Sequence, residues 1–351
     1  MSLFLVTGAG GFLGRYICEQ LIARGDTVRG LARGEYPELT SAGVEMRRGD
    51  LADRETVVRA CEGVDCVIHT GGKVGVWGHW FDYFQSNVLG TLNLLGACED
   101  LGVTRMVFTS SPSVTFDAAH WNCDQRGVDA SAPYPEKWLA HYPHSKAMAE
   151  QFVLTQNGST VAGGGTLWTC ALRPHLVWGP RDHHLTRRLI ERARAGQLRR
   201  VGAGDNRVDM VYVENAAEAH LQAADALARP EALPAGKAYF ISQGEPVDCW
   251  GWIDEILALV ELPPVDRVIG ARTAYYAGAL LELKHWMMRD FKNEPRMTRF
   301  VARSLATDHW FDVEAARRDF GYEPRISTEE GMQRLGEWLN SKGEGGRGKG
   351  D

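Results

Sequence analysis

The sequence predicts an α/β protein, in which a doubly wound parallel sheet carries a second, smaller mixed α/β lobe. Two observations support this fold class. Short apolar runs alternate with helical patterns through the N-terminal half, which is typical of a parallel sheet covered by helices on both faces. The first apolar run leads directly into a glycine-rich turn and then into a helical pattern, which is the usual start of a nucleotide-binding sheet.

The elements follow in regular order. A strand is expected at residues 3–7, where apolar residues precede the glycines, and a helix at 12–24 follows them. Further apolar runs bounded by turn residues predict strands at 27–32, 44–48, 66–69, 105–110 and 169–177. Helical periodicity between these runs predicts helices at 53–61, 84–101 and 142–155. A helix at 216–228 and a strand at 238–242 are expected to return to the same sheet from the second lobe.

The chain is long enough for one large core and a second lobe packed against it. We expect a nucleotide-binding domain at residues 1–178, with residues 208–243 returning to it, and a substrate-binding lobe at 179–340. The tail at 341–351 is rich in Gly, Lys and Glu and has no apolar side chain to bury. We therefore expect this tail to be disordered.

The composition excludes several classes of protein. The formal net charge is −6, and an acidic surface repels phosphate backbones, so we expect no nucleic-acid partner. Seven cysteines without C-x-x-C spacing favour a reducing compartment and argue against a disulfide framework and against a bound metal. The first strand begins at Leu3 and leaves no room for a signal peptide, and no uncharged apolar stretch has the length of a membrane span. These features predict a cytoplasmic protein.

The first turn has the pattern of a dinucleotide-binding Rossmann sheet. Gly8 permits a tight turn, Gly11 lets the backbone approach a pyrophosphate, and Gly14 lets the following helix pack close to the strand. The N-terminus of that helix offers free N–H groups and the positive end of its dipole to the phosphates. A plain glycine-rich turn is the alternative, but the position between the first strand and the first helix favours a nucleotide site.

The end of the second strand indicates which dinucleotide binds. NAD-binding chains usually place an acid there to accept a hydrogen bond from the ribose 2′-hydroxyl. Here Ala32 and Arg33 occupy that place, and the next acid is Glu35. The guanidinium of Arg33 can pair with a 2′-phosphate, so we expect NADP(H). The alternative is that Arg33 lies in solvent and the site discriminates little.

Tyr142 and Lys146 lie four residues apart at the start of a predicted helix and therefore share one face. The preceding strand ends in several hydroxyl residues, which include Ser111, and the carboxyl ends of parallel strands meet the ligand crevice. We expect Ser111 to hydrogen-bond a substrate carbonyl and Tyr142 to supply the proton. Lys146 is expected to lower the pKa of the phenol and to hold the cofactor ribose. The alternative is a buried tyrosine with an exposed lysine on the next turn.

These motifs together resemble the extended short-chain dehydrogenase/reductases, through the glycine turn at 7–14, Tyr-x-x-x-Lys at 142–146 and Leu-Arg-Pro at 172–174. A more specific resemblance is to the 3β-hydroxysteroid dehydrogenase branch, and it rests on the segments 50–51, 69–70, 73–78, 87–91, 109–114, 172–180, 212–217 and 239–242. Within that branch the chain is similar to the bacterial 2-alkyl-3-oxoalkanoate reductases of long-chain olefin biosynthesis, through 141–143, 173–180 and 309–312.

The resemblance implies further cofactor contacts. Gly10, Phe12 and Leu13 would complete the first turn, and Asp50 and Leu51 would border the adenine. The remaining implied contacts, along the cofactor and at its nicotinamide end, are Thr70, Gly71, Lys73, Asn87, Thr109, Tyr142, Lys146, Pro174 and His175.

The resemblance also implies an activity, namely NADPH-dependent reduction of the ketone of a hydrophobic substrate, such as a 3-oxo fatty acid or a steroid-like molecule. Two alternatives stay open: a nucleotide-sugar epimerase or dehydratase with bound NAD, and a non-catalytic NADP-binding module. An intact Ser, Tyr and Lys argue against the module, since mere binding needs no proton donor. A homodimer, peripheral membrane contact and association with other enzymes of an olefin pathway are left open as partners.

One segment of the second lobe bears on the substrate. Residues 268–291 combine Tyr, Trp, Met and Leu side chains with interspersed charged ones such as Glu282 and Lys284. Such side chains adapt to flexible alkyl chains. Three interpretations stay open, which are a helix packed on the core of its own lobe, a lid over the substrate, and a helix on a membrane surface.

Overall fold

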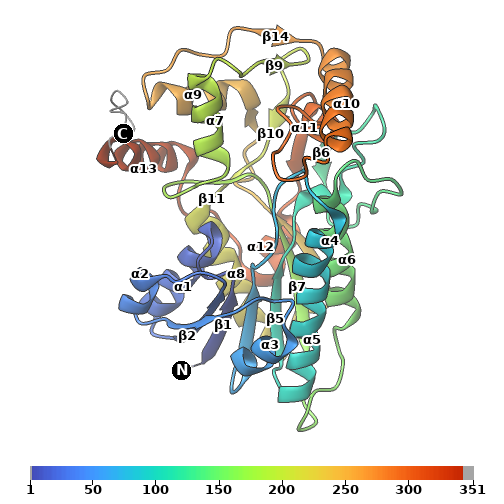
Figure 1. Ribbon diagram of the computed structural model, residues 1–351. Coiled ribbons are helices and arrows are strands. Elements are labelled where there is room, and N and C mark those ends of the chain that lie inside the picture. The colour runs from blue at the N-terminus through green and yellow to red at the C-terminus, as the bar shows by residue number, and fades with distance from the viewer. Residues whose placement is uncertain (1, 343–351) are drawn as a thin grey trace.

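The computed structural model describes residues 2–342 and confirms the expected fold class (Figure 1). A seven-stranded parallel sheet has the order β12-β7-β5-β4-β1-β2-β3. Its strands are β1 (Leu3–Thr7), β2 (Thr27–Ala32), β3 (Glu45–Arg48), β4 (Cys66–His69), β5 (Arg105–Thr109), β7 (Trp168–Pro174) and β12 (Ala238–Ile241). The order reverses between β1 and β4, and in doubly wound sheets this switch point is where a ligand binds.

Helices cover both faces of the sheet because its strands alternate their side chains between two cores. Phe4 and Val6 of β1 belong to one core and Leu5 to the other. One face carries α1 (Phe12–Arg24), α2 (Pro37–Ser41) and α8 (Val213–Leu227), and the other carries α3 (Arg54–Cys61), α5 (Gly90–Leu101) and α6 (His141–Thr155).

The prediction of a helix at 84–101 is wrong in one respect, because these residues do not form a single α-helix. The chain forms α4 (Trp80–Tyr83), then a π-helical segment, η1 (Phe84–Leu89), and only then α5. Asn87 lies in the π-helical turn and uses its side chain to bond Lys73 and Ser145. A local π-helical turn is a common way to aim one side chain at a functional region.

The second lobe has a mixed four-stranded sheet in the order β13-β10-β15-β6. These strands are β6 (Gln125–Val128), β10 (Arg207–Val208), β13 (Val247–Asp248) and β15 (His309–Phe311). Two strand pairs join β8 (Val177–Trp178) to β11 (Val211–Tyr212) and β9 (Arg200–Val201) to β14 (Val268–Ile269). Because β6 comes from the connection between β5 and α6, the chain enters the second lobe between the residues Ser111 and Tyr142.

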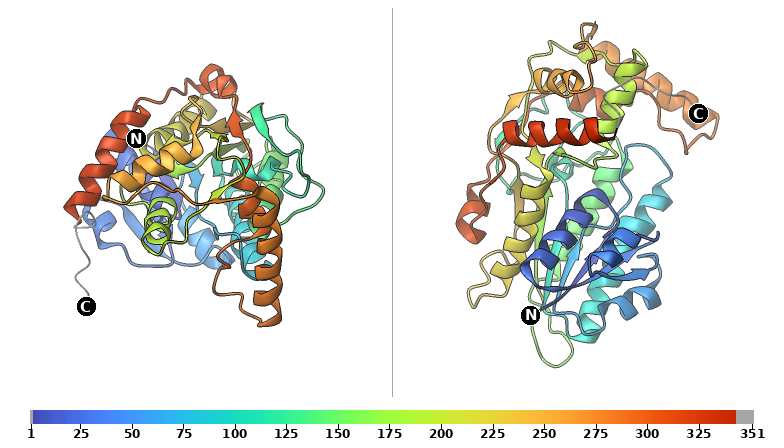
Figure 2. Two further views of the ribbon diagram at one scale, coloured as in Figure 1. Left: turned by 90° about the horizontal axis from the view of Figure 1, so that it is seen from above. Right: turned by 90° about the vertical axis from the view of Figure 1, so that its left-hand side faces the viewer.

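The helices of the second lobe surround a core that contains three tryptophans, Trp178, Trp250 and Trp252. These helices are α7 (Leu185–Arg194), α9 (Cys249–Ala258), α10 (Ala271–Met287), α11 (Arg299–Ser304) and α13 (Thr328–Ser341). The helix α12 (Glu314–Phe320) instead packs on the core of the seven-stranded sheet, and the chain also has a short 3₁₀ turn, η2 (Pro112–Thr115). In both views of Figure 2, α10 projects beyond the body of the molecule. Ser341 ends α13, and the rest of the tail expected to be disordered lies, from residue 343 on, outside the described residues.

A buried ion pair ties α6 to β7. Arg173 and Glu150 are 2% and 0% exposed, and two hydrogen bonds of 2.5 and 3.0 Å join the guanidinium to the carboxylate. Tyr134 donates to the same carboxylate at 2.7 Å, and Arg173 donates to the Ala130 carbonyl at 3.3 Å. This network therefore anchors the loop that leads into α6 as well as the helix itself.

The described residues have three general properties. The seven cysteines are free and buried. No group of His, Cys, Asp or Glu side chains within residues 2–342 is arranged to hold a metal ion. None of the helices in that range combines the length and the apolar character needed to cross a bilayer.

Candidate active site

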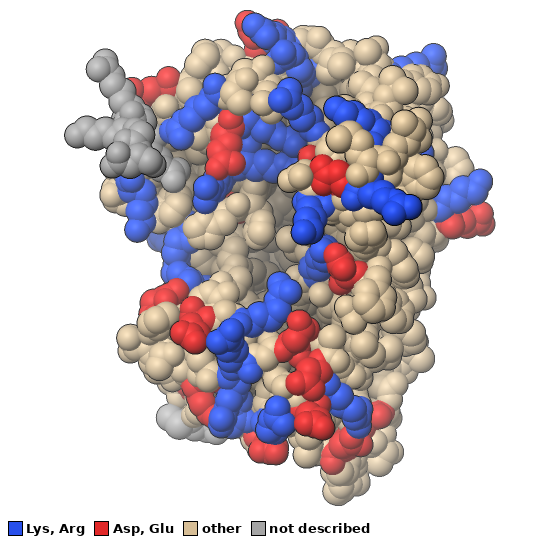
Figure 3. Space-filling view, viewed as in Figure 1, with Lys and Arg blue, Asp and Glu red and all other residues tan. Residues whose placement is uncertain are grey.

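A cavity of about 360 Å³ lies at the carboxyl ends of the central strands. Figure 3 shows the molecule hollowed between the two lobes, with Lys and Arg side chains gathered around the hollow. Of the residues expected to bind the cofactor or to act in catalysis, the lining contains Gly8, Gly11, Phe12, Leu13, Gly14, Arg33, Asp50, Leu51, Thr70, Gly71, Lys73, Thr109, Tyr142 and Lys146. The structure thus brings most of the expected set together around one space.

The glycine turn needs residues without a side chain, because a Cβ on Gly8 or Gly14 would collide with neighbouring backbone atoms. Gly8 has a φ of 69°, and a Cβ on it would come within 2.8 Å of Gly71. A Cβ on Gly14 would lie 2.3 Å from the Gly8 carbonyl oxygen, so the helix could not pack as close to the turn. Gly11 begins α1 without a side-chain cap, which leaves the first N–H groups of the helix available for an anion. These observations fit a dinucleotide pyrophosphate.

Gly10 does not itself line the cavity. The ring of Tyr36 lies over this glycine, and a Cβ there would fall 2.0 Å from a ring carbon. Tyr36 itself lines the cavity. Sequence reasoning missed this tyrosine because a residue in the loop after β2 gives no periodic signal.

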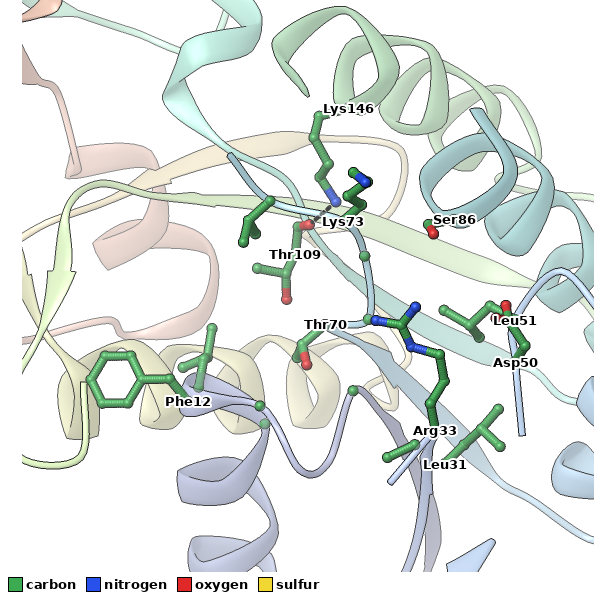
Figure 4. Close-up of a pocket in the computed structure, with 18 of the residues that line it drawn as sticks. Phe12, Leu31, Arg33, Asp50, Leu51, Thr70, Lys73, Ser86, Thr109 and Lys146 are labelled. Carbon is green, nitrogen blue, oxygen red and sulfur yellow. Dashed lines mark hydrogen bonds between the residues drawn. The ribbon is translucent and has the colours of Figure 1, made fainter. Parts of the chain in front are cut away.

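Arg33 extends from the end of β2 into the cavity and lies between Leu51 and Thr70 (Figure 4). Its backbone carbonyl accepts a hydrogen bond of 3.1 Å from Arg48, which fixes the start of this loop. Ala32 lines the cavity beside Arg33, so no carboxylate stands at the end of β2. The guanidinium can therefore meet an anionic group at this end of the cavity.

Tyr142 and Lys146 line the cavity, whereas Ser111, the residue after the lining residue Ser110, does not. The Ser111 hydroxyl lies near enough to the Tyr142 phenol to act on its pKa, and it lies 2.8 Å from the Ser113 hydroxyl. Lys146 donates a hydrogen bond of 2.6 Å to the Thr109 carbonyl, as Figure 4 shows, and its Nζ lies 3.9 Å from the centre of the Phe108 ring. The hydroxyl of Thr109 lies 2.8 Å from the ring nitrogen of His220 on α8.

The expectation that Lys146 lowers the pKa of Tyr142 is wrong for this structure. Burial raises the pKa of Tyr142, and only the hydrogen bond with Ser111 acts against that rise. Burial also lowers the pKa of Lys146 to about 7, with Glu150 acting in the opposite direction. A raised pKa keeps the phenol protonated at neutral pH, and a protonated phenol is the form that can give a proton to a carbonyl.

Asn87 does not line the cavity but holds one wall of it. Its amide accepts from the Lys73 N–H at 2.6 Å, donates to the Lys73 carbonyl at 3.0 Å, and donates to the Ser145 hydroxyl at 2.8 Å. The side chain of Lys73 bonds Asp82 at 2.9 Å. Asn87 thus joins the loop after β4 to the helix that carries Tyr142.

Pro174 and His175 are two further expected contacts that do not line this cavity. The His175 ring instead lies near the rings of His309 and Phe311, with centroids 6.0 and 5.0 Å away. Other lining residues were not expected from the sequence, namely Leu31, Tyr36, Gly49, Gly72, Val74, Ser110, Ser86 and His184. Leu31 belongs to β2 and Ser86 to η1, and the others lie outside the strands and helices, where their spacing carries no chemical pattern.

A second, mostly apolar groove of about 460 Å³ begins next to Tyr142. Ala140 and His141, the two residues before Tyr142, line it together with Val76, Trp77, Gly78, Trp138, Leu139, Ala279, Glu282, Leu283, Trp286, Phe291 and Arg299. Its charged members, Glu282 and Arg299, pair with each other at 2.6 Å. The groove therefore offers an apolar wall to a ligand that reaches Tyr142.

Comparison with known proteins gives consistent matches. The model of the 3-beta hydroxysteroid dehydrogenase/isomerase family matches residues 5–263. A 2-alkyl-3-oxoalkanoate reductase of Stenotrophomonas maltophilia is 49% identical over 331 residues, which cover 94% of this chain and 97% of that protein. One of Shewanella oneidensis is 47% identical, covering 95% of this chain and 86% of that protein. Among solved structures, MoeE5 in complex with UDP-glucose and NAD has a TM-score of 0.72 at 24% identity, with 97% of this chain and 99% of that chain covered, and it shares the fold.

Proposed function

Because the chain belongs to the 3-beta hydroxysteroid dehydrogenase/isomerase family, we propose that it reduces the ketone of a lipid-like 3-oxo acid to the alcohol, with NADPH as cofactor. The observation that carries this proposal is that Tyr142 and Lys146 line the dinucleotide cavity, with Ser111 beside Tyr142, while His141, the residue before Tyr142, lines the apolar groove. NADPH, when bound, supplies the hydride.

The proposed roles of the side chains follow from their positions. Ser111 lies beside Tyr142, so both hydroxyls can donate to one carbonyl oxygen placed between them. Tyr142 then passes its proton to the oxygen as negative charge develops there. Lys146, held by the Thr109 carbonyl, is placed to contact the cofactor ribose. The glycine turn at Gly8–Gly14 holds the pyrophosphate.

The substrate class rests on the apolar groove and on the two bacterial relatives, whose names describe the reduction of a 2-alkyl-3-oxoalkanoate. The aromatic side chains of Trp77, Trp138, Trp286 and Phe291 line this groove, and they suit alkyl chains better than a sugar. A nucleotide sugar would need hydrogen-bonding groups for its hydroxyls, and the groove has few.

Turnover measurements test the proposed activity. Purified protein is expected to oxidise NADPH, followed at 340 nm, when it is given freshly prepared 2-alkyl-3-oxo acids, and to reduce NADP⁺ with the more stable 2-alkyl-3-hydroxy acids. UDP-glucose and UDP-galactose are assayed as substrates of the alternative activity, that of a nucleotide-sugar epimerase, and both are expected to remain unchanged. Interconversion of the two UDP-sugars without net change in the cofactor would overturn the proposal in favour of an epimerase.

The cofactor preference is a separate prediction, and it rests on Arg33 and Ala32. A charge-assisted hydrogen bond to phosphate contributes about 1.5–3 kcal/mol, so the protein is expected to prefer NADPH over NADH by roughly tenfold or more in kcat/KM. Arg33→Ala should remove most of this preference by weakening NADPH. Ala32→Asp should reverse it, because a carboxylate accepts from a 2′-hydroxyl and repels a 2′-phosphate.

Steady-state kinetics with both cofactors on the three proteins measures this preference. Arg47→Ala is a matched control, since Arg47 is an exposed arginine of the neighbouring strand that does not line the cavity. Equal use of NADH and NADPH by the unsubstituted protein would show that Arg33 does not read the 2′-phosphate.

A further inference from the structure

The helix α10 presents an apolar stripe to solvent. Tyr276, Leu280, Leu283 and Met287 are 60%, 69%, 52% and 68% exposed, and their spacing of four, three and four residues places them on one face. Trp286 and Met288 are exposed beside them. Single exposed apolar residues are ordinary, but five on one projecting helix and a sixth directly after it form an apolar patch whose exposure to water is unfavourable.

The opposite face of α10 is firmly attached to the second lobe. Ala274, Gly278 and Glu282 are buried, and a Cβ on Gly278 would lie 2.7 Å from the backbone of Thr298. Glu282 accepts hydrogen bonds of 2.6 Å from both the backbone N–H and the guanidinium of Arg299. The helix α10 is therefore held in a fixed position, and the exposed stripe is a stable part of the protein surface.

The charges around the stripe are of one sign, although the whole chain carries a net charge of −6. The exposed charged residues of α10 and the segment after it are all basic: Arg272, Lys284, Arg289, Lys292 and Arg296. The carboxylates of the same stretch are less exposed and engaged, Glu282 with Arg299, Asp290 with Asn293 and Glu294 with Arg188. In Figure 3 the surface over α10 is mostly uncharged and bears blue side chains.

We propose that this stripe, together with the basic residues around it, docks on the surface of an anionic phospholipid bilayer. An apolar face flanked by Lys and Arg is the arrangement by which amphipathic helices lie in the membrane interface. A second copy of the chain fits less well, because Arg272 at one end of α10 and Lys284 and Arg289 at the other would face like charges in either orientation of two paired helices.

The apolar groove beside Tyr142 opens at the same surface, since Leu283 and Trp286 belong to both. A docked molecule would hold the mouth of the groove against the lipid. If the proposed function holds, a substrate with long alkyl chains could then pass between bilayer and groove without crossing water. The docking itself requires no turnover and is measured without it.

Vesicle flotation tests the docking with the full-length protein. We expect at least tenfold stronger binding to vesicles of mixed phosphatidylcholine and phosphatidylglycerol than to phosphatidylcholine alone, and weaker binding as salt is added. The double substitution Leu280→Glu with Met287→Glu should reduce binding at least tenfold. So should Lys284→Glu with Arg289→Glu. Both pairs leave the residues lining the two cavities unchanged.

A matched control replaces exposed apolar residues outside α10 by Glu. Leu101→Glu with Leu233→Glu changes two exposed leucines that lie in other elements, and binding is expected to stay within a factor of two. Sedimentation equilibrium of each protein accompanies the flotation. The proposal is overturned if the unsubstituted protein floats no better with anionic vesicles than the Leu280→Glu, Met287→Glu protein. A dimer that these two substitutions dissociate, without any vesicle binding, would instead identify the stripe as a contact between copies.

Discussion

Replacement of Tyr142 by Phe is expected to lower kcat by about 10²–10⁴-fold, because the substitution removes the proposed proton donor. The ring still packs, so the affinity for NADPH, measured by fluorescence titration, should change by no more than a few-fold. A reduced kcat with unchanged cofactor affinity separates loss of the chemical step from loss of binding.

Tyr276→Phe is the control for that experiment, because Tyr276 is exposed on α10 and lines neither cavity. Its kcat should equal that of the unsubstituted protein. If the Tyr142→Phe protein retains more than a tenth of the activity, another group delivers the proton.

Glu150→Gln is expected to destabilise the protein by about 3–5 kcal/mol, since the change leaves the guanidinium of Arg173 buried without its counter-ion. The glutamine keeps one acceptor oxygen for Tyr134, but its NH2 group would face an N–H donor of Arg173. Urea unfolding followed by circular dichroism measures the change in the free energy of unfolding.

The matched substitution is Glu191→Gln, which removes a carboxylate from the exposed i,i+4 pair with Arg187. Exposed pairs of this kind contribute about 0.3–0.5 kcal/mol, so the two proteins should differ clearly. Equal stability of the two proteins would mean that the buried pair is compensated by other contacts of Arg173.

The sequence predicted the fold class well because its signal is local and periodic. The apolar runs of the parallel strands are buried on both faces, so each run is visible without its partners. The glycine turn could be predicted equally well, since the close approach of Gly14 to Gly8 requires the absence of a side chain. For Tyr142 and Lys146 the four-residue spacing on a helix sufficed to bring them together.

What the sequence could not predict depends on contacts between distant residues. Asn87 forms a π-helical turn because its amide finds Lys73 and Ser145, and Tyr36 lies on Gly10 because the loop after β2 folds back. The raised pKa of Tyr142 arises from burial by the whole surrounding structure, and the spacing between Tyr142 and Lys146 says nothing about that burial. Such features become visible only when the chain is folded.

The pairing of β6 with β15 has a consequence for how the protein is made. β6 lies between Ser111 and Tyr142 in the chain, yet within the described residues its ladder partner is β15, at His309–Phe311. During synthesis the ribosome must add more than half of the chain after β6 before this partner exists. Contacts of such large sequence separation form late. The segment that joins Ser111 to Tyr142 thus lacks its partner strand β15 until late in synthesis. The nascent chain can therefore form its nucleotide-binding turn long before the region of Ser111 and Tyr142 is complete.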